Sequence, residues 1–200
     1  MNLKSYRKLF IVITLVLTLV AASIIAAFVS FQGGSEQFSE FWLLDPDHIA
    51  EHYPFNVSAG EMYKIFVNLV NHMDRSEYYL VQVKLRNITQ SILEVAGSKP
   101  SSVSSLYEFR FSVADENVWE SPVTFGFQDV SIKGDVVTVG NVIVNGKVFL
   151  ANASTDWDSK NNGFFFQLFF ELWRYDVKSQ TFKFDDRVIG IWINMTGFRD

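Results

Sequence analysis

An uncharged run of 23 residues, Leu9 to Phe31, is the feature that most constrains this chain. As an α-helix the run would be about 35 Å long, which is enough to cross a hydrocarbon core of about 30 Å. Three basic residues lie within residues 1–8, and no other basic residue occurs before Lys64. The positive-inside rule therefore predicts a cytoplasmic N-terminus, a single-pass transmembrane helix over residues 9–31, and a C-terminal domain outside the cell.

A cleaved signal peptide is the competing interpretation of this run. The apolar core of a signal peptide is about 7–15 residues long, shorter than the run here, and Val20-Ala21-Ala22 offers only a partial cleavage pattern. We therefore expect a cell-membrane protein that contacts the lipid bilayer through residues 9–31. Gly33-Gly34-Ser35 predicts a flexible linker over residues 32–37, ahead of an extracytoplasmic domain over residues 38–198.

The rest of the chain alternates apolar and polar residues with the two-residue period of β-strands, and it lacks an amphipathic helical pattern of useful length. Strands are predicted at residues 38–44, 61–70, 79–85, 107–111, 123–132, 135–144, 148–150, 164–175, 181–184 and 188–195. Asn145-Gly146 predicts a tight hairpin, and residues 61–85 are interpreted as another. The prediction is an all-β fold, an immunoglobulin-like two-sheet β-sandwich ectodomain preceded by one N-terminal transmembrane α-helix.

Composition excludes several classes of chemistry. The chain has no cysteine, which removes disulfides, thiolate zinc sites and a cysteine nucleophile, and which favours a prokaryotic or archaeal source over a eukaryotic secreted one. Residues 1–31 carry three basic residues and no acid, so the remainder has 14 basic against 22 acidic residues. An acidic domain without a basic patch argues against nucleic acid as a partner.

Two short motifs suggest metal sites. His48-Ile49-Ala50-Glu51-His52 matches a zinc-peptidase pattern, but that chemistry requires a helix, and Pro46 and Pro54 bracket the stretch. We interpret it as a solvated loop.

Asp156 and Asp158 begin a segment that resembles a calcium loop, in which Lys160 occupies a ligand position. A polar turn is the simpler interpretation, and a calcium ion near the two aspartates stays open. We find neither a G-x-S-x-G motif nor a Gly-rich phosphate loop, so we expect no catalytic residues, no cofactor and no enzymatic activity.

Four N-glycosylation sequons lie in the part of the chain predicted to be extracellular. They begin at Asn56, Asn87, Asn152 and Asn194. None has proline in the middle position, so we expect a glycoprotein.

The aromatic segment 164–175 is the most unusual in the chain, because both of its faces are apolar. One interpretation is a central strand that is buried on both sides. The other is a partner surface, made by Phe164, Phe165, Phe166, Phe169 and Phe170. Residues 120–163 could cover the second face within the chain. Trp173 and Trp192 are predicted to be buried.

Several segments carry a family resemblance. They are Glu40-Phe41-Trp42-Leu43-Leu44-Asp45-Pro46, Tyr53-Pro54, Gly60-Glu61, Val70-Asn71-His72, Tyr78 to Val83, Trp119-Glu120, Gly163 with Phe166, Leu168, Leu172 and Trp173, and Ile191-Trp192-Ile193-Asn194. With these residues the chain resembles the mainly archaeal membrane-protein family called domain of unknown function 1616. The resemblance implies an extracytoplasmic β-domain on a membrane anchor, and it implies no activity.

These observations predict a non-catalytic, membrane-anchored extracytoplasmic accessory or interaction domain of the cell envelope or of a membrane complex, with a protein partner. One alternative is a glycan-binding β-sandwich module that uses Trp42, Trp119 and Trp157. The other alternative is a pilin-like filament subunit. An archaeal pilin signal has Gly or Ala after the basic residue, whereas here Lys8 meets Leu9.

Overall fold

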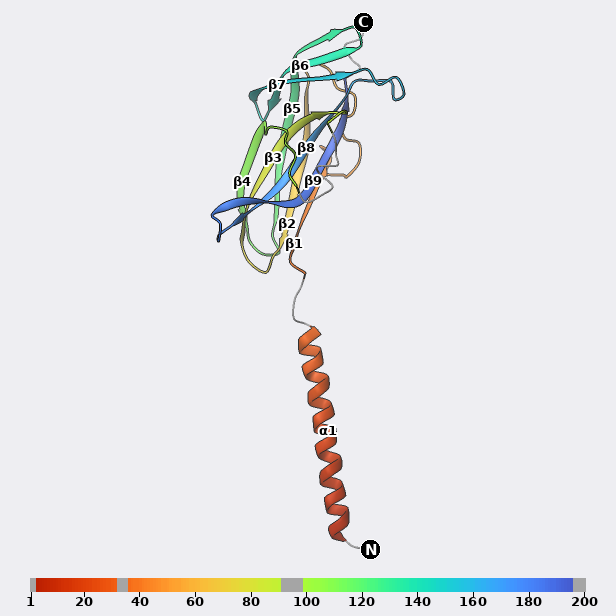
Figure 1. Ribbon diagram of the computed structural model, residues 1–200, viewed down its shortest axis with the longest axis vertical. Helices are drawn as coiled ribbons and strands as arrows, with labels where there is room; N and C mark the ends of the chain where they lie inside the picture. Colours follow the sequence, from red (N-terminus) through yellow and green to blue (C-terminus); the bar gives the residue numbers. More distant parts are fainter. Residues whose placement is uncertain (1–2, 32–35, 91–98, 196–200) are drawn as a thin grey trace. The chain divides into compact units, whose positions relative to one another are not determined.

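The chain forms two units, Met1–Gln37 and Phe38–Asp200, in a computed structural model that describes residues 3–31, 36–90 and 99–195 (Figure 1). Most of the predicted linker, the last residues of the predicted domain and Thr196 of the fourth sequon lie outside the described residues. The first unit contains helix α1, Leu3–Phe31. Among the residues described, no helix combines the length and the apolar character needed to span a membrane.

The second unit is built from two antiparallel sheets, as predicted. Sheet A has the strand order β1-β2-β5-β6-β7, and sheet B has the order β4-β3-β8-β9. The bounds are β1 Phe38–Leu44, β2 Met62–His72, β3 Glu77–Asn87, β4 Tyr107–Val113, β5 Val118–Lys133, β6 Val136–Val144, β7 Lys147–Asp156, β8 Phe165–Asp176 and β9 Thr181–Asn194. The all-β, two-sheet prediction is confirmed.

The core lies between the two sheets. On β2, Ile65, Val67 and Leu69 are fully buried, and on β3 so are Val81 and Val83. Each set occupies every second position of its strand, as expected for strands with one face toward a core. The Asn145-Gly146 hairpin joins β6 to β7, with both residues at positive φ, the geometry of a type I′ turn.

The predicted hairpin over residues 61–85 is wrong. β2 pairs with β1 and β5, whereas β3 pairs with β4 and β8, so the chain crosses from one sheet to the other between these strands. The apolar faces of the two strands therefore pack against each other across the core. Two-residue alternation reports which face is buried, but it does not distinguish a neighbour in the same sheet from one in the opposite sheet.

The two last predicted strands are one strand, β9. Its register against β8 shifts between Leu172 and Trp173, which pair with Arg187 and Phe184 respectively. Such an irregularity adds residues to one strand and bends it, which explains why the alternation seems to stop there in the sequence.

A buried ion pair lies on the outer face of sheet B. Lys84 Nζ is 2.7 Å from Glu171 Oε2, and the two side chains are 4% and 0% exposed. The backbone N–H of Ser101 donates to Glu171 Oε1 at 2.7 Å, and the Ser101 carbonyl accepts from Lys84 at 3.1 Å. This network fixes Ser101, in the segment before β4, against the outside of β3 and β8.

Candidate functional site

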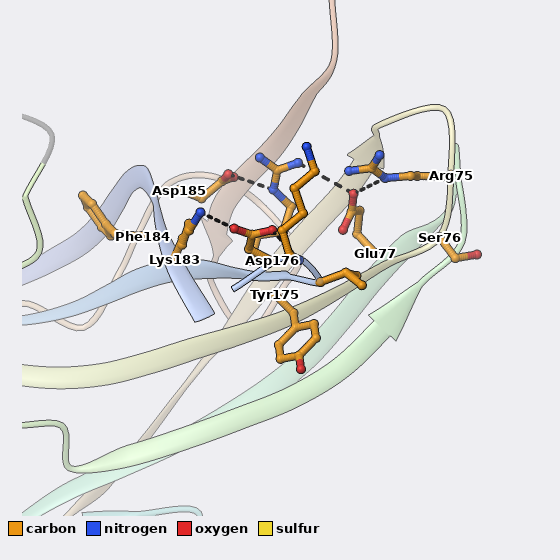
Figure 2. A pocket seen from close by; sticks show the side chains of 11 residues that line it. Arg75, Ser76, Glu77, Tyr175, Asp176, Lys183, Phe184 and Asp185 are labelled. Atoms are coloured by element: carbon orange, nitrogen blue, oxygen red, sulfur yellow. Dashed lines mark hydrogen bonds and ion pairs between the residues drawn. The ribbon is translucent and has the colours of Figure 1, made fainter. Parts of the chain in front are cut away.

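A charged cleft opens at the end of the sandwich where β1 begins. Its volume is about 480 Å³, and it lies between the turn that precedes β3 and the hairpin that joins β8 to β9 (Figure 2). The charged residues that line it are Arg75, Glu77, Arg174, Asp176, Lys178, Lys183 and Asp185. Four basic and three acidic side chains thus share one cavity of an otherwise acidic chain.

Arg174 links two acidic side chains inside this cleft. Its Nη1 is 3.7 Å from Glu77 Oε1, and its Nε is 3.3 Å from Asp185 Oδ1. Glu77, which is largely buried, also accepts from Arg75 Nε at 2.6 Å. The hydrogen bond between Arg75 and Glu77 joins two ionised groups and belongs to the strong class, while Arg174 lies within ion-pair distance of both acids.

The pKa values of two aspartates of the cleft are shifted in opposite directions. Burial raises the pKa of Asp185, although Arg174, Arg187 and a hydrogen bond from Ser39 act against it. The hydrogen-bonded ion pair with Lys183 lowers the pKa of Asp176 to about 2. Asp176 therefore stays ionised at any physiological pH.

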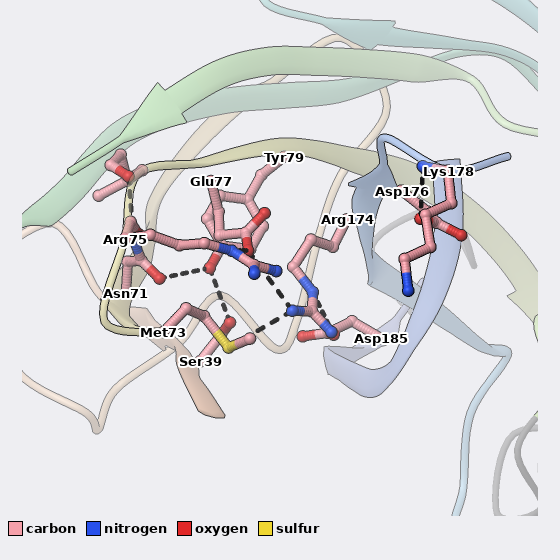
Figure 3. Close-up of polar contacts among 11 residues, drawn as sticks. Ser39, Asn71, Met73, Arg75, Glu77, Tyr79, Arg174, Asp176, Lys178 and Asp185 are labelled. Carbon is pink, nitrogen blue, oxygen red and sulfur yellow. Dashed lines mark hydrogen bonds and ion pairs between the residues drawn. The ribbon is translucent and has the colours of Figure 1, made fainter. Parts of the chain in front are cut away.

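A buried hydrogen-bond network supports the cleft from the core side (Figure 3). The Tyr79 hydroxyl donates to Asn71 Oδ1 at 3.0 Å and lies 2.9 Å from the Ser39 hydroxyl. The Asn71 amide donates to the carbonyl groups of Arg75 and Val113. Because these residues come from β1, β2, β3, β4 and the turn beside the cleft, the network fixes four strands and the cleft wall together.

Tyr79 lies beneath the cleft and does not line it. Burial raises the pKa of Tyr79 to about 12, so its hydroxyl stays protonated and is a poor base. The cleft itself presents positive and negative charges to solvent, and such a pattern recognises complementary charges on another molecule.

The segment from His48 to His52 is a loop and not a helix. His48 and His52 both have positive φ and lie in irregular chain, and His48 stacks on Phe66 at 4.1 Å and sits 3.3 Å from Glu120. Within residues 3–31, 36–90 and 99–195, no group of three or more histidines and acidic residues is placed to hold a metal ion.

Asp158 organises the turn that follows β7. It accepts hydrogen bonds from the Asn161 side chain and from the backbone N–H groups of Lys160 and Asn161, and these bonds lower its pKa. This is the polar turn that the sequence predicted. A calcium ion near Asp156 and Asp158 stays an open prediction.

The predicted partner surface on the aromatic segment is wrong. Phe164, Phe166 and Phe170 belong to the core between the sheets. Phe165 and Phe169 point outward, yet they are only 7% and 1% exposed. The Phe55 ring lies 6.1 Å from the Phe165 ring, and the Arg86 guanidinium lies 5.7 Å from the Phe169 ring. β8 is therefore a central strand buried on both faces, and strands β5 to β7 cover its inner face only.

The four sequon asparagines differ in accessibility. Asn56 and Asn152 are exposed, and Asn87 is partly buried with its amide donating to the Ser154 carbonyl at 2.7 Å. Asn194 is 6% exposed, and its amide donates to Asn56 Oδ1 at 3.1 Å. Asn194 is therefore the least accessible of the four in the folded chain, and glycosylation at all four asparagines stays a prediction.

The tryptophans named for glycan binding are packed against other rings. Trp119 stacks on Phe111 at 3.6 Å, Trp157 meets Phe164 at 4.9 Å, and Trp42 is partly buried. Trp192, predicted to be buried, is 37% exposed instead.

Sequence reasoning missed the charged cleft. Its residues come from two distant segments, 75–77 and 174–185, and each segment by itself reads as an ordinary charged turn. The signal that could have found it is the close alternation of acids and bases in both segments, combined with the sheet order that brings β3 and β8 together.

The structure is thus a two-sheet, all-β domain with a charged cleft at one end. The family model for the Domain of unknown function (DUF1616) matches residues 32–135, and the chain belongs to this family. The resemblance noted in the sequence is thereby confirmed, although its pieces after residue 135 lie outside the matched range.

Solved structures offer weaker likenesses. A mutant β-glucosidase from Listeria innocua in complex with laminaribiose is 10% identical with a TM-score of 0.42, and the match covers 83% of this chain and 17% of that one. An ASH/PapD-like domain of human CEP192 is 8% identical with a TM-score of 0.32, over 81% and 86% of the two chains. This chain thus spans less than a fifth of the glucosidase. A search of curated proteins gave no match.

Proposed function

We propose that this chain is a non-catalytic, membrane-anchored interaction domain that holds a protein partner of the cell envelope in its charged cleft. The anchor is the uncharged run 9–31, with basic residues before it and the domain outside the cytoplasm. The observation that carries the partner site is the cleft itself, in which Arg174 pairs with the largely buried Glu77 and Asp185 among further charges of both signs.

A protein segment fits this cleft better than a small apolar molecule. Its walls carry charged groups from both sides, and complementary charges on a partner would add orientation and specificity. The cleft is also stiff, because Glu77, Tyr79 and Asn71 are buried and hydrogen-bonded beneath it. A preformed site loses less conformational freedom when it binds.

Site-specific crosslinking tests this proposal. A photoreactive residue in place of Lys178, in the β8–β9 hairpin, should form a defined crosslinked product in native membranes. The same residue in place of Lys133, an exposed position in the hairpin at the other end of the domain, is the matched control and should not.

A charge swap sharpens the test. Asp176→Lys combined with Lys183→Asp inverts the ion pair and also removes the hydrogen bonds that Asp176 accepts from the Lys178 N–H and the Ser179 hydroxyl. A swapped protein whose circular dichroism spectrum shows the folded domain should lose the crosslinked product. Equal crosslinking by the swapped protein would show that the cleft does not recognise its partner by charge.

Protease treatment of intact cells tests the orientation. The domain after residue 37 should be digested, while the first residues stay protected. Complete protection of the chain would refute the extracytoplasmic placement.

A further inference from the structure

An apolar hollow lies on the domain away from the charged cleft. Its volume is about 450 Å³, and its lining is Phe55, Ile88, Asn161, Phe165 and Trp192. Phe55, Ile88 and Trp192 are each exposed by more than a third. Exposed aromatic side chains that gather in this way mark a contact surface.

Strand pairing places the sequon residue Asn56 on the same face as this hollow. Asn194 pairs with Phe165 of β8, and it forms an isolated bridge with Asn56. Directly paired residues point to the same side of a sheet, and so do residues two apart on one strand. Asn56, Phe165 and Trp192 therefore share the outer face of sheet B at one end.

The Asn56 side chain is available for modification. It is exposed, and the hydrogen bond from Asn194 uses its oxygen, Oδ1. In the described part of the chain, no hydrogen bond uses Asn56 Nδ2, the atom that would carry an N-linked sugar. The bond from Asn194 thus orients the side chain and leaves its nitrogen for the glycan.

The other sequons do not point to the hollow. Asn87 turns its amide toward the Ser154 carbonyl of β7, and Asn152 lies on β7 itself, the edge strand of the other sheet. None of the sequon asparagines lines the hollow itself, although Phe55, next to Asn56, and Ile88, next to Asn87, both do. Of the two exposed sequon asparagines, Asn56 alone lies beside the aromatic side chains.

We propose that the apolar hollow is the docking surface for the protein's own N-linked glycan, attached at Asn56. A sugar ring has apolar C–H faces that pack against aromatic rings, while its hydroxyl groups can donate to the side-chain oxygen of Asn161, whose nitrogen donates to Asp158. The Arg86 guanidinium, 5.6 Å from the Trp192 ring, supports that ring beneath the sugar. This inference rests on the extracytoplasmic placement proposed above.

Two variants made in the natural host test it. Ser58→Ala removes the Asn56 sequon and leaves the Asn56–Asn194 hydrogen bond in place. Ser154→Ala removes the Asn152 sequon and is the matched control. Mass spectrometry measures glycan occupancy at each asparagine, hydroxyl-radical footprinting measures oxidation of Trp192 and Phe55, and thermal unfolding gives the melting temperature.

We expect Asn56 to be occupied in the unmodified sequence. In Ser58→Ala, oxidation of Trp192 and Phe55 should rise and the melting temperature should fall by about 2–4 °C, a modest shift for a domain of this size. Ser154→Ala should leave the oxidation of Trp192 and Phe55 unchanged, and its melting temperature should reflect only the lost exposed hydrogen bond between the Ser154 and Thr138 hydroxyls.

Three results would overturn the inference. Absence of a glycan from Asn56 in a protein that carries one at Asn87 or Asn152 would refute the inference and leave the extracytoplasmic placement intact. An empty Asn56 in a domain that protease digests on intact cells would do the same. Loss of the Asn56 glycan without added oxidation of Trp192 would show that a partner, lipid or a second copy covers the hollow instead. Protection of the whole chain from protease would instead refute the placement itself.

Discussion

The buried pair of Lys84 and Glu171 gives the sharpest test of the energetics. Glu171 is fully buried, and its carboxylate has two partners at 2.7 Å, Lys84 Nζ and the backbone N–H of Ser101. Lys84→Met keeps the apolar stem of the side chain and removes the positive charge. The carboxylate then remains in the interior with one neutral donor.

Removing one partner of such a pair costs about 3–5 kcal/mol, because the remaining charge is neither hydrated nor compensated. For a domain of this size, that loss lowers the melting temperature by about 6–20 °C. Urea unfolding and calorimetry of the variant measure both quantities. Gln82→Met is the matched control, since it lies two residues earlier on the same face of β3 but is partly exposed, and it should change stability by about 0.5 kcal/mol or less.

The double variant separates charge from packing. Lys84→Met with Glu171→Met removes both charges and should recover most of the loss, with about 1–3 kcal/mol remaining because the Ser101 N–H loses its acceptor. A single variant as stable as the unmodified protein would show that water reaches Glu171. A double variant as unstable as the single one would show that the loss arises from packing.

Three further changes have defined outcomes. Gly163→Ala should lower stability by about 1–3 kcal/mol in urea unfolding, because its Cβ would clash with the Asn194 side chain in a buried site. A hydrogen bond to Glu116 raises the pKa of His72 above its usual 6.5. The protonated His72 therefore stabilises the folded domain fully below pH 6.5, and this contribution is lost as pH rises through the raised pKa. His72→Gln should remove this part of the dependence of melting temperature on pH, and an unchanged profile would contradict the assignment. Tyr79→Phe should cost about 1–2 kcal/mol, since Asn71 loses a buried donor, and calorimetry at one pH measures it.

Strand positions were predictable where apolar residues occupy every second position of a strand. The alternation at Ile65, Val67 and Leu69 located β2, and Asn145-Gly146 located a hairpin, from local chemistry alone. The assignment of β2 and β3 to different sheets was not predictable in this way. Both strands bury apolar residues, and the choice of neighbour depends on contacts distant in the sequence.

The sites were less predictable than the strands. A row of phenylalanines in the sequence does not reveal that Arg86 and Phe55 cover its outer side, because these residues lie far away along the chain. Likewise, nothing local distinguishes the buried Asn194 from the exposed Asn56. Both sequons have the same pattern, and only the pairing of β9 with the segment around Asn56 separates them.

The position of β1 has a mechanical consequence. β1 is an edge strand, and it pairs with β2 along its whole length, from Phe38 opposite His72 to Leu44 opposite Phe66. It begins at one end of the domain, whereas β9 ends at Asn194 near the other end (Figure 1). A pull between these two points runs along β1, while its hydrogen bonds to β2 lie across that direction. A stretching force on the domain would therefore have to break all the hydrogen bonds between β1 and β2 together, by shear, instead of one after another.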